Sequence, residues 1–410
     1  MPLSRPSLRR GVLITAVASS ILVTAVAVAA GPVGPPAART GAAWVDPTQT
    51  VVPAGTSPTV PGGQPTVPGE LRLVAAGDVL VHPALTDQAR RDARRAGRPG
   101  LDFAPMFAGV APAIGGADLA LCHLETPLAP PDGPFAGYPA FSAPPQVLDG
   151  IQAAGFDGCS TASNHTLDQG VDGVVRTLDA LDASGLGYTG SARSAAEAET
   201  PRIYEVAGAR VAHLSYTQNF NGLRRPPGKR WLANLIDPAE VLSAARRART
   251  AGADIVVLSL HWGTEYQHRP DTTQESWARQ LIASPDVDLI LGHHAHAVQP
   301  FRRVGEKWVV FGMGNQLARH ATPIDANREG IMARATFTRD GSGRWRVSRM
   351  EALPTWTELR PDIRLVDLAE ALADPATPPA TRRAYRATYE RVMGHVRAGG
   401  GADQVVGPAA

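Results

Sequence analysis

Short apolar runs alternate with segments of helical periodicity between residues 71 and 313, and this alternation constrains the fold more than any other feature of the chain. The runs have the length and apolarity of strands that are buried on both faces. Helix-length segments separate several of them, such as residues 173–185 and 238–252. The alternation predicts βαβ units, and therefore an α/β fold with helices packed outside a sheet. The strand candidates are residues 71–76, 118–124, 156–161, 210–216, 254–260, 286–291 and 308–313.

The C-terminal part of the chain has a different pattern. Two β-like segments flank a Gly-Ser-Gly turn at 341–343 and predict a hairpin. Residues 362–397 have the pattern of two helices. We therefore expect a folded domain over residues 70–355, C-terminal helices packed on it over 356–397, and a flexible tail over 398–410.

The N-terminal segment indicates export. Arginines precede twenty uncharged residues, 11–30, which are long enough to cross a bilayer at ~1.5 Å per residue. Residues 1–30 are thus a signal peptide or a membrane anchor. The apolar run exceeds the roughly 7–15 residues usual for a cleaved signal, which favours the anchor. We expect a single-pass protein of the cell membrane with its folded domain outside, or a secreted protein if the signal is cleaved.

A linker follows the export segment. Residues 31–69 are rich in Pro, Gly and Thr and contain few large apolar side chains, so we expect an extended linker. Export also permits disulfides, but the two cysteines, Cys122 and Cys159, both fall in apolar strand-like runs. We therefore predict that they are buried free thiols.

The net charge is only +2, and almost all of the positive charge is arginine. Basic clusters occur at residues 90–98 and 224–230. A basic rim near a pocket would attract an anionic substrate, although each cluster is also typical of a solvated helix face or loop. No nucleic-acid motif is visible, so nucleic acid is not an expected partner.

Side chains with metal-ligand chemistry follow five of the apolar runs. The carboxyl ends of strands converge at one edge of an α/β sheet, so these side chains are expected to form one cluster. Mixed oxygen and nitrogen ligands suit one or two divalent ions such as Mn, Fe or Zn. The residues are Asp78 and His82; His123 and Glu125; Asn164, His165 and Asp168; His261 and Glu265; and His293, His294 and His296.

Structural roles compete with this interpretation at several positions. His123 is also compatible with a core histidine, and His213, in the middle of a strand candidate, is expected to be one. Asp168 and Glu265 are also suited to cap loops. Trp262 and Tyr266 are expected to wall the pocket, and Asn315 is a further candidate for the site.

Seven motifs in order, over residues 70 to 317, carry a family resemblance: GDVL, HLETPL, SNHTLDQG, GYTGSARSAAEA, HWGTEY, GHHAHAVQP and GMGNQL. The series closely resembles the CapA-type bacterial capsule synthesis proteins, which are associated with poly-γ-glutamate. Their domain is similar to calcineurin-like metallophosphoesterases. The resemblance implies a four-layer αββα sandwich with two metals at the strand ends.

The resemblance also implies roles for individual residues. Asp78 would hold the first metal, Glu125 would bridge, and Asn164 and His261 would hold the second metal. His294 and His296 would supply one imidazole to each metal, and His293 is an additional residue. His165 would act as the acid or electrostatic stabiliser, oriented by Asp168. Leu80 stands where the usual motif has a histidine, and His82 and His123 are the candidates to replace that ligand.

The sequence leads to two functional hypotheses. The first is an exported, metal-dependent hydrolase-like protein of capsule or cell-envelope polymer biosynthesis, which uses a metal-activated water on an anionic polymer or phosphoester. The second is a noncatalytic polymer-binding or export component of a capsule synthesis complex. Other capsule synthesis proteins, and the membrane through the N-terminal helix, are the expected partners.

Overall fold

The computed structural model describes residues 69–322 and 324–399, together with the backbone of 405–406. The predicted signal or anchor, residues 31–68 of the predicted linker, and most of the predicted tail lie outside the described residues. Within the part of the chain that is described, no helix has both the length and the apolar character needed to cross a bilayer.

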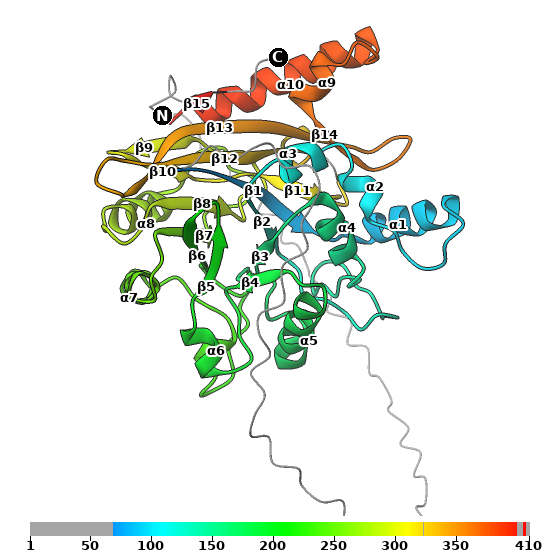
Figure 1. The fold of residues 1–410 in the computed structure, drawn as a ribbon. Helices are drawn as coiled ribbons and strands as arrows, with labels where there is room; N and C mark the ends of the chain where they lie inside the picture. Colours follow the sequence, from blue (N-terminus) through cyan, green and yellow to red (C-terminus); the bar gives the residue numbers. More distant parts are fainter. Residues whose placement is uncertain (1–68, 323, 400–404, 407–410) are drawn as a thin grey trace, which may run out of the picture. The chain divides into compact units, whose positions relative to one another are not determined.

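Two β-sheets form the centre of the fold (Figure 1). The first sheet has nine strands, with the order β14-β13-β12-β1-β2-β3-β4, β11 beside β1, and β15 beside β13. Its strands are β1 (Glu70–Leu80), β2 (Leu119–Leu124), β3 (Gly158–Ser160), β4 (Gly187–Thr189), β11 (Asn315–Ala318), β12 (Glu329–Arg339), β13 (Trp345–Glu358), β14 (Arg364–Asp367) and β15 (Val405–Val406).

The second sheet has six strands in the order β5-β6-β7-β8-β10-β9. They are β5 (Arg202–Val206), β6 (Ala209–Thr217), β7 (Ile255–His261), β8 (Leu289–His293), β9 (Phe301–Val304) and β10 (Lys307–Val310). Strands β1 to β4 are mutually parallel, as are β6, β7, β8 and β10. Each sheet therefore presents a row of carboxyl ends along one edge.

The two sheets pack against each other through a shared apolar core. Strand β1 contributes Leu71 and Leu73 to this core, whereas Val74 points to the opposite face, as the two-residue period of a strand requires. From the second sheet, Val257 and Leu291 pack in the same core. Burial of these side chains is the main force that holds the sheets together.

Helices cover the outer faces of both sheets. Helices α1, α4 and α5 pack on the first sheet, and α7 and α8 pack on the second, on the opposite side of Figure 1. Two of these helices begin at strong N-caps, since the side chains of Asp237 and Asp271 accept hydrogen bonds from the first-turn amides of α7 and α8. The helices are α1 (Pro83–Arg95), α2 (Ala104–Phe107), α3 (Ala111–Gly115), α4 (Val147–Ala154), α5 (Gly170–Ala183), α6 (Ala195–Glu199), α7 (Pro238–Thr250), α8 (Thr272–Ile282), α9 (Leu368–Ala373) and α10 (Pro379–Arg397), with 3₁₀ turns at Arg230–Leu232 and Asp325–Asn327.

The structure agrees with the predicted α/β class, and each of the seven predicted runs contains a strand. The predicted hairpin is β12 and β13, and two helices, α9 and α10, lie in the predicted C-terminal helical segment. Six short strands were not predicted, namely β4, β5, β9, β11, β14 and β15. Each has only two to five residues, too few for a clear periodicity.

The prediction of free thiols is wrong. Cys122 on β2 and Cys159 on β3 form a disulfide. The two strands are parallel neighbours and the cysteines are register partners, which places their Cα atoms 4.4 Å apart. The sequence does not reveal which strands are neighbours, so burial alone led to the wrong prediction.

Candidate metal centre

Five side chains with metal-ligand chemistry meet where the carboxyl ends of the two sheets face each other. Asp78 lies near the end of β1 and is the register partner of His123 on β2. His261 ends β7 and is the register partner of His293, which ends β8. The ligand cluster, as we call it, consists of Asp78, His123, Glu125, His261 and His296.

The ligand atoms in this cluster are close together and buried. They form two overlapping groups that share Asp78, one with His123 and His261 and one with Glu125 and His296, and the atoms within each group lie within 4.8 Å of one another. The Nδ1 atom of His296 is 3.2 Å from Asp78 Oδ2, and its Nε2 atom is 3.6 Å from Glu125 Oε1. Two groups with a shared carboxylate could hold one or two ions.

The loop after β8 is held in an unusual backbone conformation. His294 and His296 have positive φ angles of 83° and 48°, which cost of order 1–3 kcal/mol each in residues other than glycine. The carboxylate of Asp78 stabilises this loop, because Oδ2 accepts the backbone N–H of His294 at 3.1 Å. Strain of this kind is typical of functional sites.

Several buried polar atoms in and beside the cluster lack a protein partner. Neither carboxylate oxygen of Glu125 makes a hydrogen bond, and the same is true of Nε2 of His293 and Nδ1 of His294. A buried carboxylate without a partner is costly, and a coordinated cation would remove that cost. The residues present therefore fit a divalent metal, since carboxylate oxygens and imidazole nitrogens are its usual ligands.

Burial and neighbouring charges shift the pKa values of the residues in the cluster. Burial, together with the neighbouring charge of Asp78, raises the pKa of Glu125 well above its usual value. Burial lowers the pKa of His123 and of His261 well below the usual range, so both imidazoles are neutral, which is the form that binds metal. Burial opposes the charged form of His296 as well, but the carboxylates of Glu125 and Asp78 raise its pKa to about 10.

The predicted ligands Asn164 and His261 lie together. The Oδ1 atom of Asn164 is 2.9 Å from Nε2 of His261, whose Nδ1 atom is 2.9 Å from Nε2 of His123. His294, the other predicted ligand, has its ring centroid 4.6 Å from that of His261, with the two rings tilted, and burial lowers its pKa to about 4. It lies beside the two ligand groups without belonging to either.

The predicted catalytic pair is in contact. Nδ1 of His165 lies 2.7 Å from Oδ2 of Asp168, which also accepts the backbone N–H of Phe141 at 2.7 Å. An ionised carboxylate only accepts hydrogen bonds, so Nδ1 of His165 carries the proton. The ring of Phe141 packs edge-on against that of His165 at 4.7 Å. The imidazole is therefore held in one orientation.

The four additional candidate ligands differ in how they lie relative to the ligand cluster. His123 belongs to the ligand cluster, and His293 stacks on its ring at 4.1 Å, with Nδ1 3.2 Å from Asp78. His82 lies beside the cluster, where its Nδ1 atom is 3.0 Å from the carbonyl oxygen of Leu80. Glu265 makes no contact with the ligand atoms, but its charge acts on Glu125 and His296.

Tyr266 and Trp262, which were both expected to wall the pocket, differ in their exposure. Tyr266 is partly exposed, with its ring centroid 6.0 Å from that of His296, as expected for a pocket wall. The same prediction for Trp262 is wrong, because this side chain is fully buried in the core under α7 and α8. Its indole N–H donates to the carbonyl oxygen of Phe311 at 2.9 Å. Successive residues at the end of a strand point to opposite faces, and His261 takes the face of the site.

His320 is a site residue that sequence reasoning missed. Its ring lies 5.3 Å from that of His296, and its Nε2 atom is 3.1 Å from the amide nitrogen of Asn315. The Oδ1 atom of Asn315 in turn lies 2.9 Å from Nδ1 of His296. The signal was the proximity of His320 to the GMGNQL motif, but only the pairing of β11 with β1 shows that this segment reaches the cluster.

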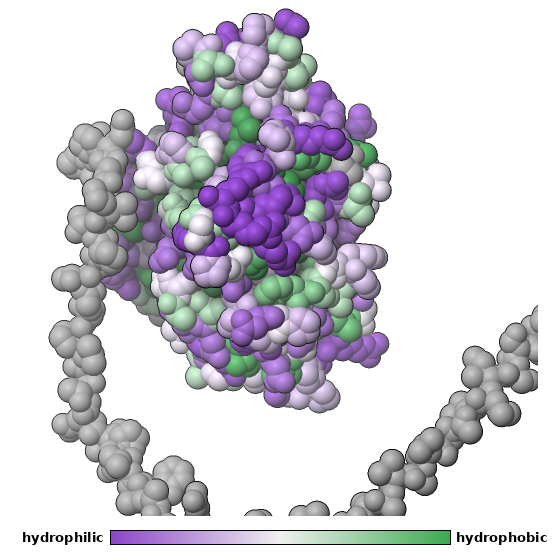
Figure 2. Space-filling view, turned by 90° about the vertical axis from the view of Figure 1, so that its right-hand side faces the viewer, coloured by the Kyte–Doolittle hydropathy of each residue, from purple (hydrophilic) through white to green (hydrophobic). Residues whose placement is uncertain are grey.

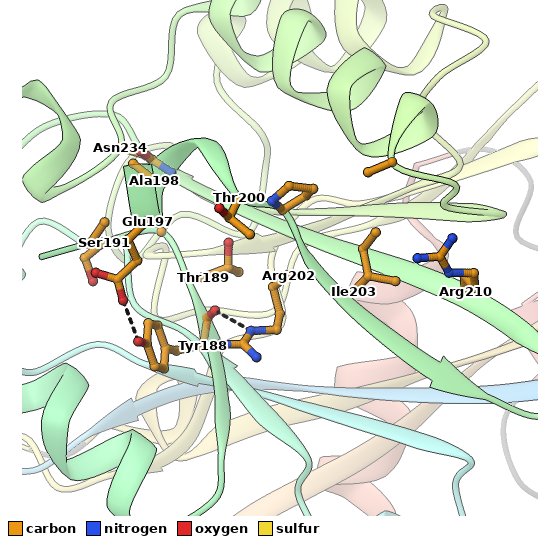
Figure 3. A pocket seen from close by; sticks show the side chains of 14 residues that line it. Tyr188, Thr189, Ser191, Glu197, Ala198, Thr200, Arg202, Ile203, Arg210 and Asn234 are labelled. Carbon is orange, nitrogen blue, oxygen red and sulfur yellow. Dashed lines mark hydrogen bonds between the residues drawn. The ribbon is translucent and has the colours of Figure 1, made fainter. Parts of the chain in front are cut away.

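A separate cavity of about 420 Å³ lies beside β4 and β5 (Figure 3). Arg202 points along one wall, where its Nε atom donates to the carbonyl oxygen of Tyr188 at 3.4 Å. Glu197 accepts a hydrogen bond from the hydroxyl of Tyr188 at 2.6 Å. None of the predicted site residues lines this cavity. The candidate functional site is therefore the ligand cluster and not this cavity.

Curated proteins match parts of the chain. The capsule biosynthesis protein CapA of Bacillus anthracis is 29% identical over 178 residues, which make up 42% of this chain and 43% of that protein. The PGA biosynthesis protein CapA of Bacillus subtilis (strain 168) is 27% identical over 201 residues, 48% of this chain and 51% of that protein. The chain thus matches about half the length of these relatives.

Solved structures are more distant. The calcineurin-like phosphoesterase YfkN from Bacillus subtilis is 13% identical with a TM-score of 0.44, over 80% of this chain and 99% of that one. A putative 5′-nucleotidase from Staphylococcus aureus is 13% identical with a TM-score of 0.45, over 78% of this chain and 58% of that one. Neither similarity says anything about the activity of this chain.

The match to a family model covers more of the chain than the matches to the curated relatives do. The family model of the bacterial capsule synthesis protein PGA_cap matches residues 72–320, which is more than half of the chain and includes the whole ligand cluster. The chain therefore belongs to the family of bacterial capsule synthesis protein PGA_cap.

Proposed function

We propose that this chain is an exported, metal-dependent hydrolase that acts on an anionic polymer of the capsule or cell envelope. The observation that carries the proposal is the buried carboxylate of Glu125, which makes no hydrogen bond and lies in one ligand group with Asp78 and His296. Helices on both outer faces of two packed sheets support the four-layer sandwich of the metallophosphoesterase type. The apolar segment 11–30, behind several arginines, supports export, with the folded domain outside the cell or released.

The ligand cluster would hold one or two divalent ions. Asp78 is shared by both groups, and His123 with His261 would complete one site while Glu125 with His296 would complete the other. Asn164 and His294 would complete the coordination from either side of His261. When bound, such ions lower the pKa of a bound water and polarise a phosphoryl or carbonyl oxygen.

The chain itself supplies an oriented imidazole next to this site. Asp168 holds the proton of His165 on Nδ1, so a second proton, carried on Nε2 in the imidazolium form, would be the one passed to a leaving oxygen or nitrogen. Asp168 is itself fixed by the backbone N–H of Phe141, so the pair keeps its geometry without substrate. A site that only binds a polymer would not need an imidazole oriented in this way.

The family and the relatives support an anionic envelope polymer as the substrate class. The family is one of capsule synthesis, and the two CapA relatives are named for capsule and PGA biosynthesis. The bond that is cleaved is either a phosphoester or a γ-glutamyl amide, because activated water attacks both. Other capsule synthesis proteins are the proposed partners.

The full chain, loaded with Mn²⁺ or Zn²⁺, tests the proposal with two substrates, p-nitrophenyl phosphate and a γ-linked glutamate oligomer. Turnover of either, abolished by EDTA and restored by metal, supports hydrolysis. Absence of turnover of both, with the oligomer bound equally well by the His165→Ala variant, would favour a noncatalytic polymer-binding or export component instead.

A further inference from the structure

A second feature near the ligand cluster is a cavity of about 350 Å³ beside α1. Three arginines from distant parts of the chain converge on it: Arg91 from α1, Arg319 from the segment after β11, and Arg360 from the segment after β13. The rest of the lining is Ala84, Asp87, Leu359 and Ile363.

The charges of these three arginines are not neutralised by carboxylates in the described part of the chain. Arg91 donates to the neutral amide oxygen of Gln88 at 2.6 Å, and Arg319 donates to the carbonyl oxygen of His320. Arg360 is exposed and makes no hydrogen bond or ion pair with any described residue. The one acid of the lining, Asp87, is already bonded to Arg90 outside the cavity at 2.7 Å.

Other arginines in the same region do pair with carboxylates. Arg364 binds both carboxylate oxygens of Asp92, at 2.8 and 2.9 Å. Arg95 binds Asp362 at 2.6 Å. The carboxylates of Asp92 and Asp362 beside α1 thus pair with arginines that do not line the cavity. The lining therefore keeps a net positive charge.

The cavity adjoins the ligand cluster. The backbone N–H of Arg319 points to Nδ1 of His82 at 3.3 Å, and the ring of His82 lies 4.7 Å from that of His320. His320 in turn lies 5.3 Å from His296, a member of the cluster. The His82 and His320 side chains therefore link Arg319, one of the lining residues, to the candidate metal site.

We propose that this cavity binds carboxylates of the anionic polymer and holds the chain as it enters the metal site, an inference that rests on the proposed function. Arginine forms paired hydrogen bonds with carboxylates, and three guanidinium groups suit carboxylates repeated along a chain. The apolar lining residues Ala84, Leu359 and Ile363 suit aliphatic spacers between those carboxylates, and this favours a glutamyl polymer over a polyphosphate.

The surface around the cavity is suited to a charged polymer. In Figure 2, which faces the side on which α1 projects in Figure 1, strongly hydrophilic residues gather in the middle of the surface. Arg90, Arg94, Arg95 and Arg98 of this segment are all exposed. Such a patch raises the rate of encounter with an anionic partner, and its effect weakens as salt increases.

The test measures binding of a fluorescent, γ-linked glutamate decamer to the full chain by anisotropy. The Arg91→Gln/Arg360→Gln variant should raise the Kd about tenfold, as expected for the loss of two solvated charge-assisted contacts. The control, Arg246→Gln/Arg383→Gln, removes two exposed arginines that lie outside the cavity and outside this patch, and it should change the Kd less than about twofold. Thermal melting of both variants checks that they are folded.

Equal weakening by both double variants would overturn the proposal, because it would show a diffuse charge effect. The proposal would also fall if inorganic polyphosphate bound more tightly and were the only probe that the cavity variant weakened. Two readouts separate failure of this inference from failure of the proposed function. A cavity variant should bind the decamer more weakly yet still hydrolyse a small ester, whereas failure of the proposed function would remove ester turnover from the wild type and leave the weaker decamer binding of the cavity variant unchanged.

Discussion

The Oδ1 atom of Asp78 lies 3.2 Å from Nδ1 of His293, a residue 215 positions later in the chain. This contact joins β1 of the first sheet to β8 of the second at the edge where the sheets meet. The same carboxylate accepts the N–H of His294, so a single aspartate holds the loop that carries three histidines. Hydrogen bonds from His293 and His296 overcome the effect of burial and lower the pKa of Asp78 well below its usual value.

Asn315 should tune the metal site without being a ligand. Its Oδ1 atom is 2.9 Å from Nδ1 of His296, a contact that leaves Nε2 of the imidazole directed toward Glu125. Loss of such an orienting partner typically costs about 10–100-fold in metal affinity. We expect the Asn315→Ala variant to bind Zn²⁺ about 10–100-fold more weakly in a competitive chelator titration. An unchanged affinity would mean that His296 does not coordinate metal.

His165 should contribute to turnover and not to metal binding. A positioned general acid typically contributes about 10²–10⁴-fold to the rate. We therefore expect the His165→Gln variant to lower kcat by about 10²–10⁴-fold while the metal content stays the same. The matched variant Asp168→Asn should lower kcat in the same direction, because Nδ1 of His165 then loses its charged acceptor. A fall in metal content that parallels the fall in kcat would argue against the role of acid.

The disulfide should stabilise the first sheet. It joins residues 37 positions apart, and closing a loop of that length is worth about 3–4 kcal/mol in the chain-entropy description. We expect the Cys122→Ala/Cys159→Ala variant to unfold at a lower denaturant concentration, with a loss of about 2–4 kcal/mol. Dithiothreitol should destabilise the wild-type chain and leave this variant unaffected. A stability of the wild type that does not respond to reductant would show that the bond does not form.

His213 should make the folded domain sensitive to acid. This residue is buried in β6, as expected for a core histidine, with Nε2 2.8 Å from the hydroxyl of Ser259, and burial lowers its pKa to about 3. The unfolded chain takes up this proton near pH 6.5, whereas the folded chain does not until about pH 3. The contribution to stability is therefore full above pH 6.5 and is lost as the pH falls toward 3.

The measurement is the free energy of unfolding as a function of pH. In the His213→Gln variant, the slope between pH 6 and 4 should fall by about 1.4 kcal/mol per pH unit relative to the wild type. If the two slopes are equal, His213 does not stay neutral in the folded chain.

The sequence predicted the parts of the fold that depend on local pattern. Long apolar runs such as β1 and β7 have a period and a length that identify them, and the polar residues at their ends led to Asp78 and His261. Features that depend on which strands are neighbours were not predictable in this way. The Cys122–Cys159 bond requires that β2 lie beside β3, and the role of His320 requires that β11 lie beside β1.

The direction in which a side chain points was also not predictable from the sequence. Trp262 follows a site histidine directly in sequence, yet it points into the core between the second sheet and its helices. The motif that contains both residues does not show this, because the orientation depends on where β7 ends. The arginine cavity could not be predicted from the sequence either, because its three arginines come from three separate segments of the chain.

Elemental analysis of the full chain, purified without chelators, shows whether the ligand cluster binds metal. The Glu125→Gln and His294→Ala/His296→Ala variants should be measured beside it, with His268→Ala, a half-buried histidine outside the cluster, as the control. We expect one to two divalent ions per wild-type chain and per control chain, and a clear loss of metal in both cluster variants. Absence of metal in the wild type after addition of Mn²⁺ or Zn²⁺, or equal metal content in all four proteins, would contradict this expectation.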